Sequence, residues 1–171
     1  MAANLPAGPR ARRKGVSAHP SDPTFYRGDD YRIGESIGYL VKQLRIQMDR
    51  AIDAEMAEHD LTGVQWAPLL AIHFGLGDTA AELARIGCVD TGAMTRMLDR
   101  LEAKRLLQRS RCPNDARIVR LELTDEGRRL CREIPFGLSR VLNRLLRGFT
   151  EPEVATFKSM IRRMLANAES N

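Results

Sequence analysis

The fold is decided by residues 78–123, which read DTAAELARIGCVDTGAMTRMLDRLEAKRLLQRSRCPNDARIVRLEL. Thr79 with Glu82 three residues later has the pattern of a helix capping box, and Asp90 precedes a second run with helical spacing. Two strand-like segments then flank a turn-forming stretch of Cys, Pro, Asn, Asp and Ala. The order helix, turn, helix, two-stranded ribbon predicts a winged helix-turn-helix over residues 61–124.

Positive charge is concentrated in the second half of this stretch. The window from Arg96 to Arg120 holds eight Lys or Arg against three Asp or Glu, and outside it the two signs balance. A localised cationic patch is the electrostatic signature of phosphate binding, although clustered charge is also common on a solvated face. The pattern favours double-stranded DNA as a partner.

The second helix of this region has the chemistry of a recognition helix. Its first two turns offer short polar side chains and an arginine fork, which are the groups that reach base edges in the major groove. On the ribbon, Arg117 is the best candidate for entering a minor groove, with Asp115 two residues earlier to brace it. The predicted DNA-binding residues are Thr91, Gly92, Thr95, Arg96, Arg100, Arg111, Asp115 and Arg117.

The flanking segments are predicted to be a basic arm and two sets of helices. Residues 1–30 are proline-rich and basic without apolar periodicity, so we expect a disordered arm that either contacts DNA or is inert. Residues 31–60 and 125–168 carry apolar stripes wider than one small lobe needs, and we expect them to form dimerisation helices. Covering the core of the same chain is the alternative. The fold class is therefore mainly α with a small β-wing, in a homodimer.

Local signals predict where several elements begin and end. A first helix is expected from Ile33 to about Glu58, and the pattern from Thr62 to Gln65 predicts a second helix that Pro68 kinks or shifts. Gly87 is expected to allow the turn before Asp90. Further helices are expected after Thr124 and Thr150, and residues 112–116 are expected to form the turn of the ribbon.

The sequence lacks the motifs of several functional classes. There is no nucleophile-base pair or phosphate loop in a recognisable frame, so no catalytic residue and no cofactor are expected. The three cysteines lack C-x-x-C spacing and no metal site is expected. No stretch is long and apolar enough to span a membrane, and the charged N-terminus does not look like a signal peptide, so we expect a cytoplasmic protein.

One alternative stays open at this point, a redox-switched regulator of the same fold. It would act through Cys112, whose pKa the neighbouring Arg109 and Arg111 would lower, or through Cys88. Reversible loss of DNA binding with peroxide, blocked by Cys112→Ser, would distinguish it from a ligand-responsive regulator.

The runs DTGAMTRMLDRL (residues 90–101), PNDAR (113–117) and LTDEG (123–127) closely resemble the multiple antibiotic resistance regulator (MarR) family. The resemblance covers roughly residues 33–166. It implies a dimeric repressor released from a pseudo-palindromic operator by a small aromatic carboxylate or phenolic effector. The family often has glycine where Arg105 stands and a basic residue where Ala116 stands. Its peroxide sensors carry a cysteine near the start of the first helix, which this chain lacks.

The resemblance also implies roles for particular residues. Thr95 and Arg96 match base readers and Arg117 matches the wing-tip arginine, while Thr95, Arg100 and Arg109 match positions that contact salicylate in the family's namesake. An effector pocket is expected between the dimerisation helices and the winged lobe, with aromatic walls and an arginine for the carboxylate. The predicted ligand-binding residues are Tyr39, Arg45, Trp66, His73, Arg100 and Arg109. For each aromatic residue, ordinary core packing is the alternative.

Overall fold

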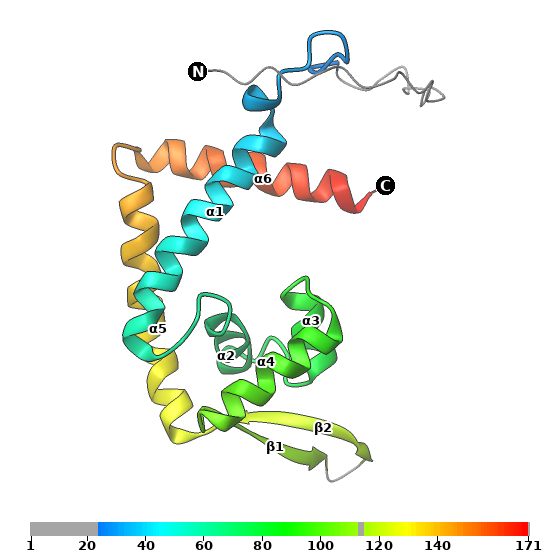
Figure 1. Cartoon of the computed structure of the whole chain (residues 1–171), viewed down its shortest axis with the longest axis vertical. Helices are drawn as coiled ribbons and strands as arrows, with labels where there is room; N and C mark the ends of the chain where they lie inside the picture. The colour runs from blue at the N-terminus through cyan, green and yellow to red at the C-terminus, as the bar shows by residue number, and fades with distance from the viewer. Residues whose placement is uncertain (1–23, 113–114, 171) are drawn as a thin grey trace, which may run out of the picture. The chain divides into compact units, whose positions relative to one another are not determined.

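The computed structural model describes residues 24–112 and 115–170, leaving aside the side chains of residues 112–118, and divides into two compact units that meet between Leu40 and Val41. The described part is mainly helical with one two-stranded antiparallel sheet, which confirms the predicted fold class (Figure 1). The elements are η1 (Ile33–Glu35), α1 (Ile37–Met56), η2 (Ala57–His59), α2 (Trp66–His73), α3 (Ala80–Ile86), α4 (Thr91–Ala103), β1 (Leu107–Cys112), β2 (Asp115–Leu123), α5 (Asp125–Leu145) and α6 (Glu151–Glu169). No helix among the described residues has the length and apolar character to cross a bilayer.

The first helix begins later than its apolar spacing predicts. Residues 33–35 form a short 3-10 turn, and Ser36 then adopts an extended conformation, with its hydroxyl donating to the Ile33 carbonyl at 2.9 Å. Helix α1 starts at Ile37, whose amide donates to the Tyr26 hydroxyl at 2.9 Å. A distant tyrosine thus caps one of the orphan amides of this helix, which sequence spacing alone does not indicate.

The second helix starts at Trp66, which is the shift that Pro68 was expected to cause as the alternative to a kink. The Gln65 side chain accepts from the Thr62 amide at 3.1 Å, which is half of the predicted capping box, but residues 63–65 form a turn and α2 begins at Trp66. A start at Thr62 would place Pro68 in the helix interior, where its missing amide costs a hydrogen bond. With the start at Trp66, Pro68 lies in the first turn, where amides have no helical partner.

The hydrophobic core joins the helix-turn-helix to the base of the strand pair. Its buried side chains come from α1 to α5 and both strands, and the fully buried ones include Met56, Leu69, Leu83, Leu98, Leu101, Leu107 and Ile134. In Figure 1, α2, α3 and α4 are grouped beside the strands, and α5 begins where β2 ends. Residues from most elements of the second unit therefore pack in the same core as the buried face of α4.

Strand β2 begins at Asp115, inside the stretch that was predicted to form the turn. Leu107 pairs with Leu123 and Arg109 with Leu121, and the register continues through a bulge at Arg111 and Cys112 to a Cys112–Asp115 pair. The predicted turn over residues 112–116 is therefore wrong in extent, since Asp115 and Ala116 belong to β2.

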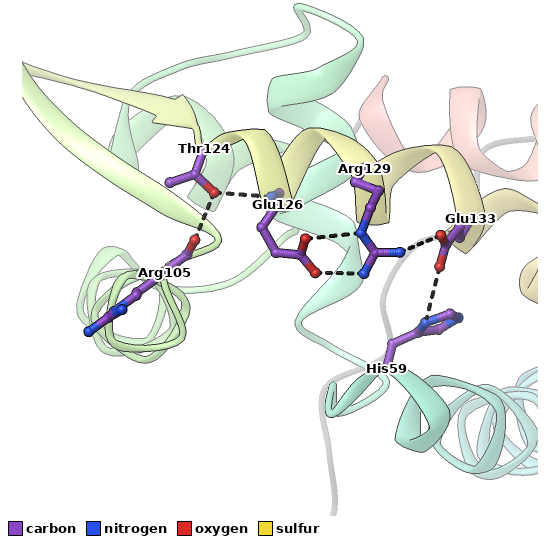
Figure 2. A network of polar contacts seen from close by, with 7 residues as sticks. His59, Arg105, Thr124, Glu126, Arg129 and Glu133 are labelled. Atoms are coloured by element: carbon purple, nitrogen blue, oxygen red, sulfur yellow. Dashed lines mark hydrogen bonds and ion pairs between the residues drawn. The ribbon is translucent and has the colours of Figure 1, made fainter.

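Helix α5 is anchored at its start by Thr124 (Figure 2). The Thr124 hydroxyl accepts from the Gly127 amide at 3.0 Å and donates to the Arg105 carbonyl at 2.7 Å, so one side chain caps α5 and ties it to the end of α4. Further along, Arg129 bridges Glu126 and Glu133, and Glu133 also lies 3.8 Å from the His59 ring. This confirms the predicted start of α5.

Part of α5 packs within its own chain, which is the alternative to a dimer interface that the sequence left open. Val141 is 1% exposed and Leu138 packs against the core, where α5 contacts α2 and β2. Only the end of the stripe, at Leu142 and Leu145, remains exposed. Helix α6 differs, since it begins at the predicted Thr150–Glu153 capping box and has no buried residue.

Three helices end on a left-handed residue that is not glycine: Asp60, Cys88 and Arg105. At the end of α4 the Arg105 amide donates to the Glu102 carbonyl and the Leu106 amide to the Leu101 carbonyl, which is a Schellman motif. At the end of α3 the left-handed residue is Cys88 at φ 51°, whereas Gly87 has φ −79°. The prediction that Gly87 makes this turn is therefore wrong by one residue.

Arg105→Gly is expected to raise the free energy of unfolding by about 1 kcal/mol, because a Cβ at φ 57° is strained and glycine is not. Chemical denaturation measures the change. Arg105→Ala is the control, because it removes the same guanidinium and keeps the Cβ. Equal gains from both variants would show that charge, rather than backbone strain, sets the stability.

Candidate nucleic-acid interface

Helix α4 presents one exposed face and one buried face. Asp90 caps the helix by accepting from the Ala93 amide at 2.8 Å, which confirms the predicted cap. The inner residues Met94, Leu98 and Leu101 are buried. The outer face carries Thr91, Gly92, Thr95, Arg96, Asp99 and Arg100, all exposed as the helical spacing predicts.

Helix α3 holds α4 in place from its N-terminal side. The predicted capping box is present: Glu82 accepts from the Thr79 amide and hydroxyl, and the Thr79 hydroxyl accepts from the Glu82 amide. Hydrogen bonds from the Asp78 amide and from Thr79 lower the pKa of Glu82, so the carboxylate stays charged. Leu83 and Ala84 then bury the inner side of α3 in the same core as Met94.

The first turns of α4 are tightly arranged. A Cβ on Gly92 would lie 3.2 Å from Asp90 Oδ1 and 3.5 Å from Arg96 Nη1, so glycine leaves room for both the cap and the folded-back guanidinium. The Thr95 hydroxyl donates to the Thr91 carbonyl at 2.8 Å. This bond leaves the hydroxyl lone pairs and the methyl group of Thr95 for an incoming ligand.

The cationic patch is smaller than the sequence count implies, because several of its members are paired. Arg109 contacts Asp99 and Glu102, Arg120 contacts Asp78, and Lys104 contacts Asp60. Among the described side chains, those of the patch that are exposed with no ion-pair partner are Arg96, Arg100, Arg105 and Arg111. They come from α4, from the residue that follows its C-cap and from β1.

Two predicted DNA-binding residues, Asp115 and Arg117, have side chains outside the described part. Their backbone lies in β2, so they belong to the strand pair as expected. The other six predicted DNA-binding residues are exposed, five on α4 and Arg111 on β1. The strand pair thus extends the surface that begins on α4.

A mostly apolar cavity of about 360 Å³ lies among α1, α2, α3 and α4. Arg45 and Trp66 line it, as predicted for a ligand site. The Arg45 guanidinium also contacts Asp49, with Nε 2.7 and 2.9 Å from the two carboxylate oxygens. Other lining residues are Met48, Ile52, Val64, Ala67, Ile86, Val89, Met94 and Met97.

The remaining predicted ligand residues do not line this cavity. His73 lines a separate, open cleft of about 530 Å³ with Arg120 and Arg128, and its ring packs edge-on against Phe74 at 5.1 Å. Arg109 is held by two carboxylates and Arg100 lies on the outer face of α4. Tyr39 belongs to the first compact unit. Of the five predicted ligand residues in the second unit, Arg45 and Trp66 therefore line the same cavity, and His73, Arg100 and Arg109 do not.

The methionine side chains that line the cavity were not predicted as ligand-binding residues from the sequence. Met97 is only partly buried although it falls on the inner stripe of α4. A methionine-rich inner stripe on a helix this short is the signal that a flexible apolar wall was present. These side chains adapt their shape, which suits a site for a small apolar ligand.

The two cysteines with described side chains differ in environment. Cys131 is buried, its thiol lies 3.5 Å from the Leu69 carbonyl, and burial raises the pKa of the thiol to about 11. Cys88 is exposed in the turn before α4. The side chain of Cys112 lies outside the described part. A high pKa makes Cys131 a poor nucleophile.

Comparisons with known proteins agree with this geometry. A family model described as the MarR family matches residues 61–119. The multiple antibiotic resistance protein MarR of Escherichia coli (strain K12) is 32% identical over 130 residues, which is 75% of this chain and 90% of that protein. An uncharacterized HTH-type transcriptional regulator of Bacillus subtilis (strain 168), YsmB, is 29% identical over 60% of this chain and 66% of that protein.

Two solved structures show the same fold. A mutant MarR from Escherichia coli complexed with operator DNA superposes with a TM-score of 0.70 at 32% identity, covering 75% of this chain and 93% of that one. The transcriptional regulator PA3341 gives a TM-score of 0.71 at 28% identity, covering 80% of this chain and 100% of that one. The fold of these relatives agrees with the exposed face of α4 and the strand pair that follows it, and the sequence identity extends over most of both chains. This chain therefore belongs to the MarR family of winged helix-turn-helix DNA-binding transcriptional regulators.

Proposed function

We propose that this chain represses transcription by binding a pseudo-palindromic operator as a homodimer, and that a small aromatic acid or phenol releases it. The observation that carries the proposal is the outer face of α4, where Thr91, Gly92, Thr95 and Arg96 are exposed while the opposite face is buried. Such a helix enters a major groove without disturbing its own packing.

Each exposed group of α4 suits a different part of a duplex. Arg96 matches the two acceptors of guanine, and Thr95 offers a methyl group for thymine or an acceptor for an amino group. Arg100 and Arg111 are proposed to contact phosphates. Arg117 is proposed for the minor groove beside the site, braced by Asp115.

A salt series tests whether the chain binds DNA through this surface. The dissociation constant for a fluorescent duplex is measured by anisotropy between about 50 and 200 mM salt, where several phosphate contacts weaken binding by about 10³-fold or more. A module that binds only proteins would show no salt-dependent DNA affinity. That result would contradict the proposal.

The homodimer is proposed from the unburied apolar face of α6 and the end of α5. Its members are Leu142, Leu145, Phe149, Phe157, Met160, Ile161, Met164 and Leu165. A helix with such a face and no buried residue gains stability only when another surface covers it. A two-fold partner is the usual cover in a soluble oligomer.

The chain is therefore expected to run as a dimer of about twice its 19.2 kDa mass in light scattering at micromolar concentration. Ile161→Glu is expected to weaken the dimer because it places a charge in the apolar face. Ser159→Glu adds the same charge to an exposed polar position of α6 and is the control. A wild-type monomer at this concentration would contradict the dimer.

The effector is proposed to bind the cavity lined by Arg45 and Trp66. Its apolar walls suit a flat ring, and Arg45 at its edge suits a carboxylate, although Asp49 already neutralises part of that charge. Because both α1 and α4 line the cavity, a ligand bound there would affect the position of α4 relative to α1. Release requires the ligand to bind the DNA-incompetent arrangement more tightly.

Trp66 is the one tryptophan of the chain, so its fluorescence reports on this cavity. Salicylate-like acids are expected to change it saturably at micromolar to millimolar concentration and to lower operator affinity. Ala67→Leu, which fills the cavity, is expected to abolish both effects while leaving DNA binding intact. Arg45→Met is expected to weaken carboxylic acids more than neutral phenols, because only the acids lose an ionic partner.

A panel of such acids and phenols that changes neither the fluorescence nor operator affinity would contradict the aromatic effector. The redox switch would then be the remaining candidate. It predicts a reversible loss of DNA binding with peroxide that Cys88→Ser or Cys112→Ser prevents.

A further inference from the structure

Among the described side chains of strand β1, Arg109 forms ion pairs with the recognition helix α4. Its Nη2 lies 2.7 Å from Asp99 Oδ1, and its Nη1 contacts Glu102. Asp99 and Glu102 are one turn apart on α4, so the planar guanidinium forks across that turn. The Arg109 side chain is 30% exposed, which makes this pair better shielded than most surface ion pairs.

Strand β2 is fastened to the start of the other helix of the motif. The Leu121 amide donates to the Asp78 carbonyl at 2.8 Å, and the Arg120 guanidinium contacts the Asp78 carboxylate. Asp78 in turn donates its amide to Glu82, the capping residue of α3. Asp78, which precedes the Thr79 cap of α3, is thus held by both the backbone and a side chain of β2.

The part of the ribbon beyond these contacts has less to hold it. Leu107, Leu121 and Leu123 are buried at its base, but Val119 is 45% exposed and Arg111 is exposed. Among the described side chains, which exclude those of residues 112–118, the outermost ion pairs from the ribbon to the helices are those of Arg109 and Arg120. The direction that these contacts give to the base of the ribbon also sets the direction of its far end.

We propose that Arg109, held by Asp99 and Glu102, is a positioning residue that sets the direction of the strand pair relative to α4, with Arg120 and Asp78 as the second tie. Arg109 then contributes to DNA binding through the placement of the wing and not as a phosphate contact. This inference rests on the proposed function, because it assigns a role within the same DNA-binding surface.

The energetics make such a role separable from folding. Partly exposed ion pairs contribute little to stability, while the base of the ribbon is held by buried leucines. Losing the tie leaves the wing folded but free to move. Binding then carries the added cost of ordering it against the groove.

The test is the double variant Asp99→Ala/Glu102→Ala, for which charge and positioning predict opposite signs. It removes two negative charges from the DNA-binding surface and frees Arg109, so an electrostatic role predicts tighter DNA binding. A positioning role predicts that affinity falls by about tenfold, the cost of ordering one or two side chains. Alanine keeps α4 helical, and circular dichroism melting checks that the fold is retained.

The matched control is Glu126→Ala/Glu133→Ala on α5, which raises the net charge equally and breaks another arginine-centred cluster. It is expected to leave affinity unchanged or slightly higher. Hydroxyl-radical footprinting supplies the second measurement. The Asp99/Glu102 variant is expected to lose protection in the flanking minor grooves and to keep it at the recognition-helix contacts.

Unchanged or tighter binding of the double variant, with a wild-type footprint, would overturn the positioning role while leaving DNA binding by the wild-type chain in place. Failure of the wild-type chain itself to bind duplex DNA would instead overturn the proposed function. The two failures are distinguished by the wild-type titration.

Discussion

Arg96→Ala is expected to weaken binding to the chain's own operator by about 1 to 3 kcal/mol and to relax its sequence preference, because a bidentate base contact disappears. Arg96 is exposed on the first turns of α4, and its guanidinium lies close to Gly92 where the helix starts. Affinities for the operator and for single-base variants, measured side by side, give both effects.

Two further variants separate base reading from general charge. Arg117→Ala is expected to weaken binding to all sequences and to reduce the salt slope by about one, as for a phosphate or groove contact. Arg132→Ala removes the same charge from an exposed position on α5 and is expected to have little effect. If Arg96→Ala and Arg117→Ala gave equal, sequence-blind losses, the roles assigned to them would be wrong.

Gly127→Ala is expected to cost about 3 kcal/mol or more in the free energy of unfolding. A Cβ at this position would lie 1.9 Å from the Leu106 carbonyl oxygen. That oxygen is backbone and accepts the Thr124 amide at 3.1 Å, so it cannot move without loosening the junction of β1, β2 and α5. Chemical denaturation with matched slopes measures the loss.

Gly38→Ala is the control for this substitution, because Gly38 lies in α1 with nothing within 4 Å of a built Cβ. Alanine is the better helix former there and is expected to be neutral or stabilising by up to about 1 kcal/mol. A Gly127→Ala protein as stable as the wild type would mean that the contact between β1 and α5 is looser than described.

The starts of α3, α4, α5 and α6 were predictable from sequence because the signals that make them are local, whereas α1 and α2 start later than their local patterns predict. The capping boxes at Thr79 and Thr150 and the caps at Asp90 and Thr124 each join residues three apart. Helix ends were harder to predict. Cys88 and Arg105 adopt left-handed conformations that their residue types disfavour, and tertiary packing around the two turns decides this.

The candidate site divides in the same way. The outer face of α4 follows from a period of 3.6 residues, and it is exposed as predicted. The ion pairs were not predictable, because their partners are distant in the chain. Arg109 pairs with Asp99, which is 10 residues away, and Arg120 pairs with Asp78, which is 42 residues away. Trp66 and His73 share a face of α2 but lie about 10 Å apart along it, far enough to line different cavities.

Sequence-specific DNA binding is tested by selection from a pool of random duplexes with the wild-type protein. The pool is expected to converge on an inverted repeat with half-site centres about 10 bp apart, bound about 10³-fold or more tightly than scrambled DNA of the same composition. A pool that does not converge, or selected and scrambled duplexes bound equally, would contradict sequence-specific binding.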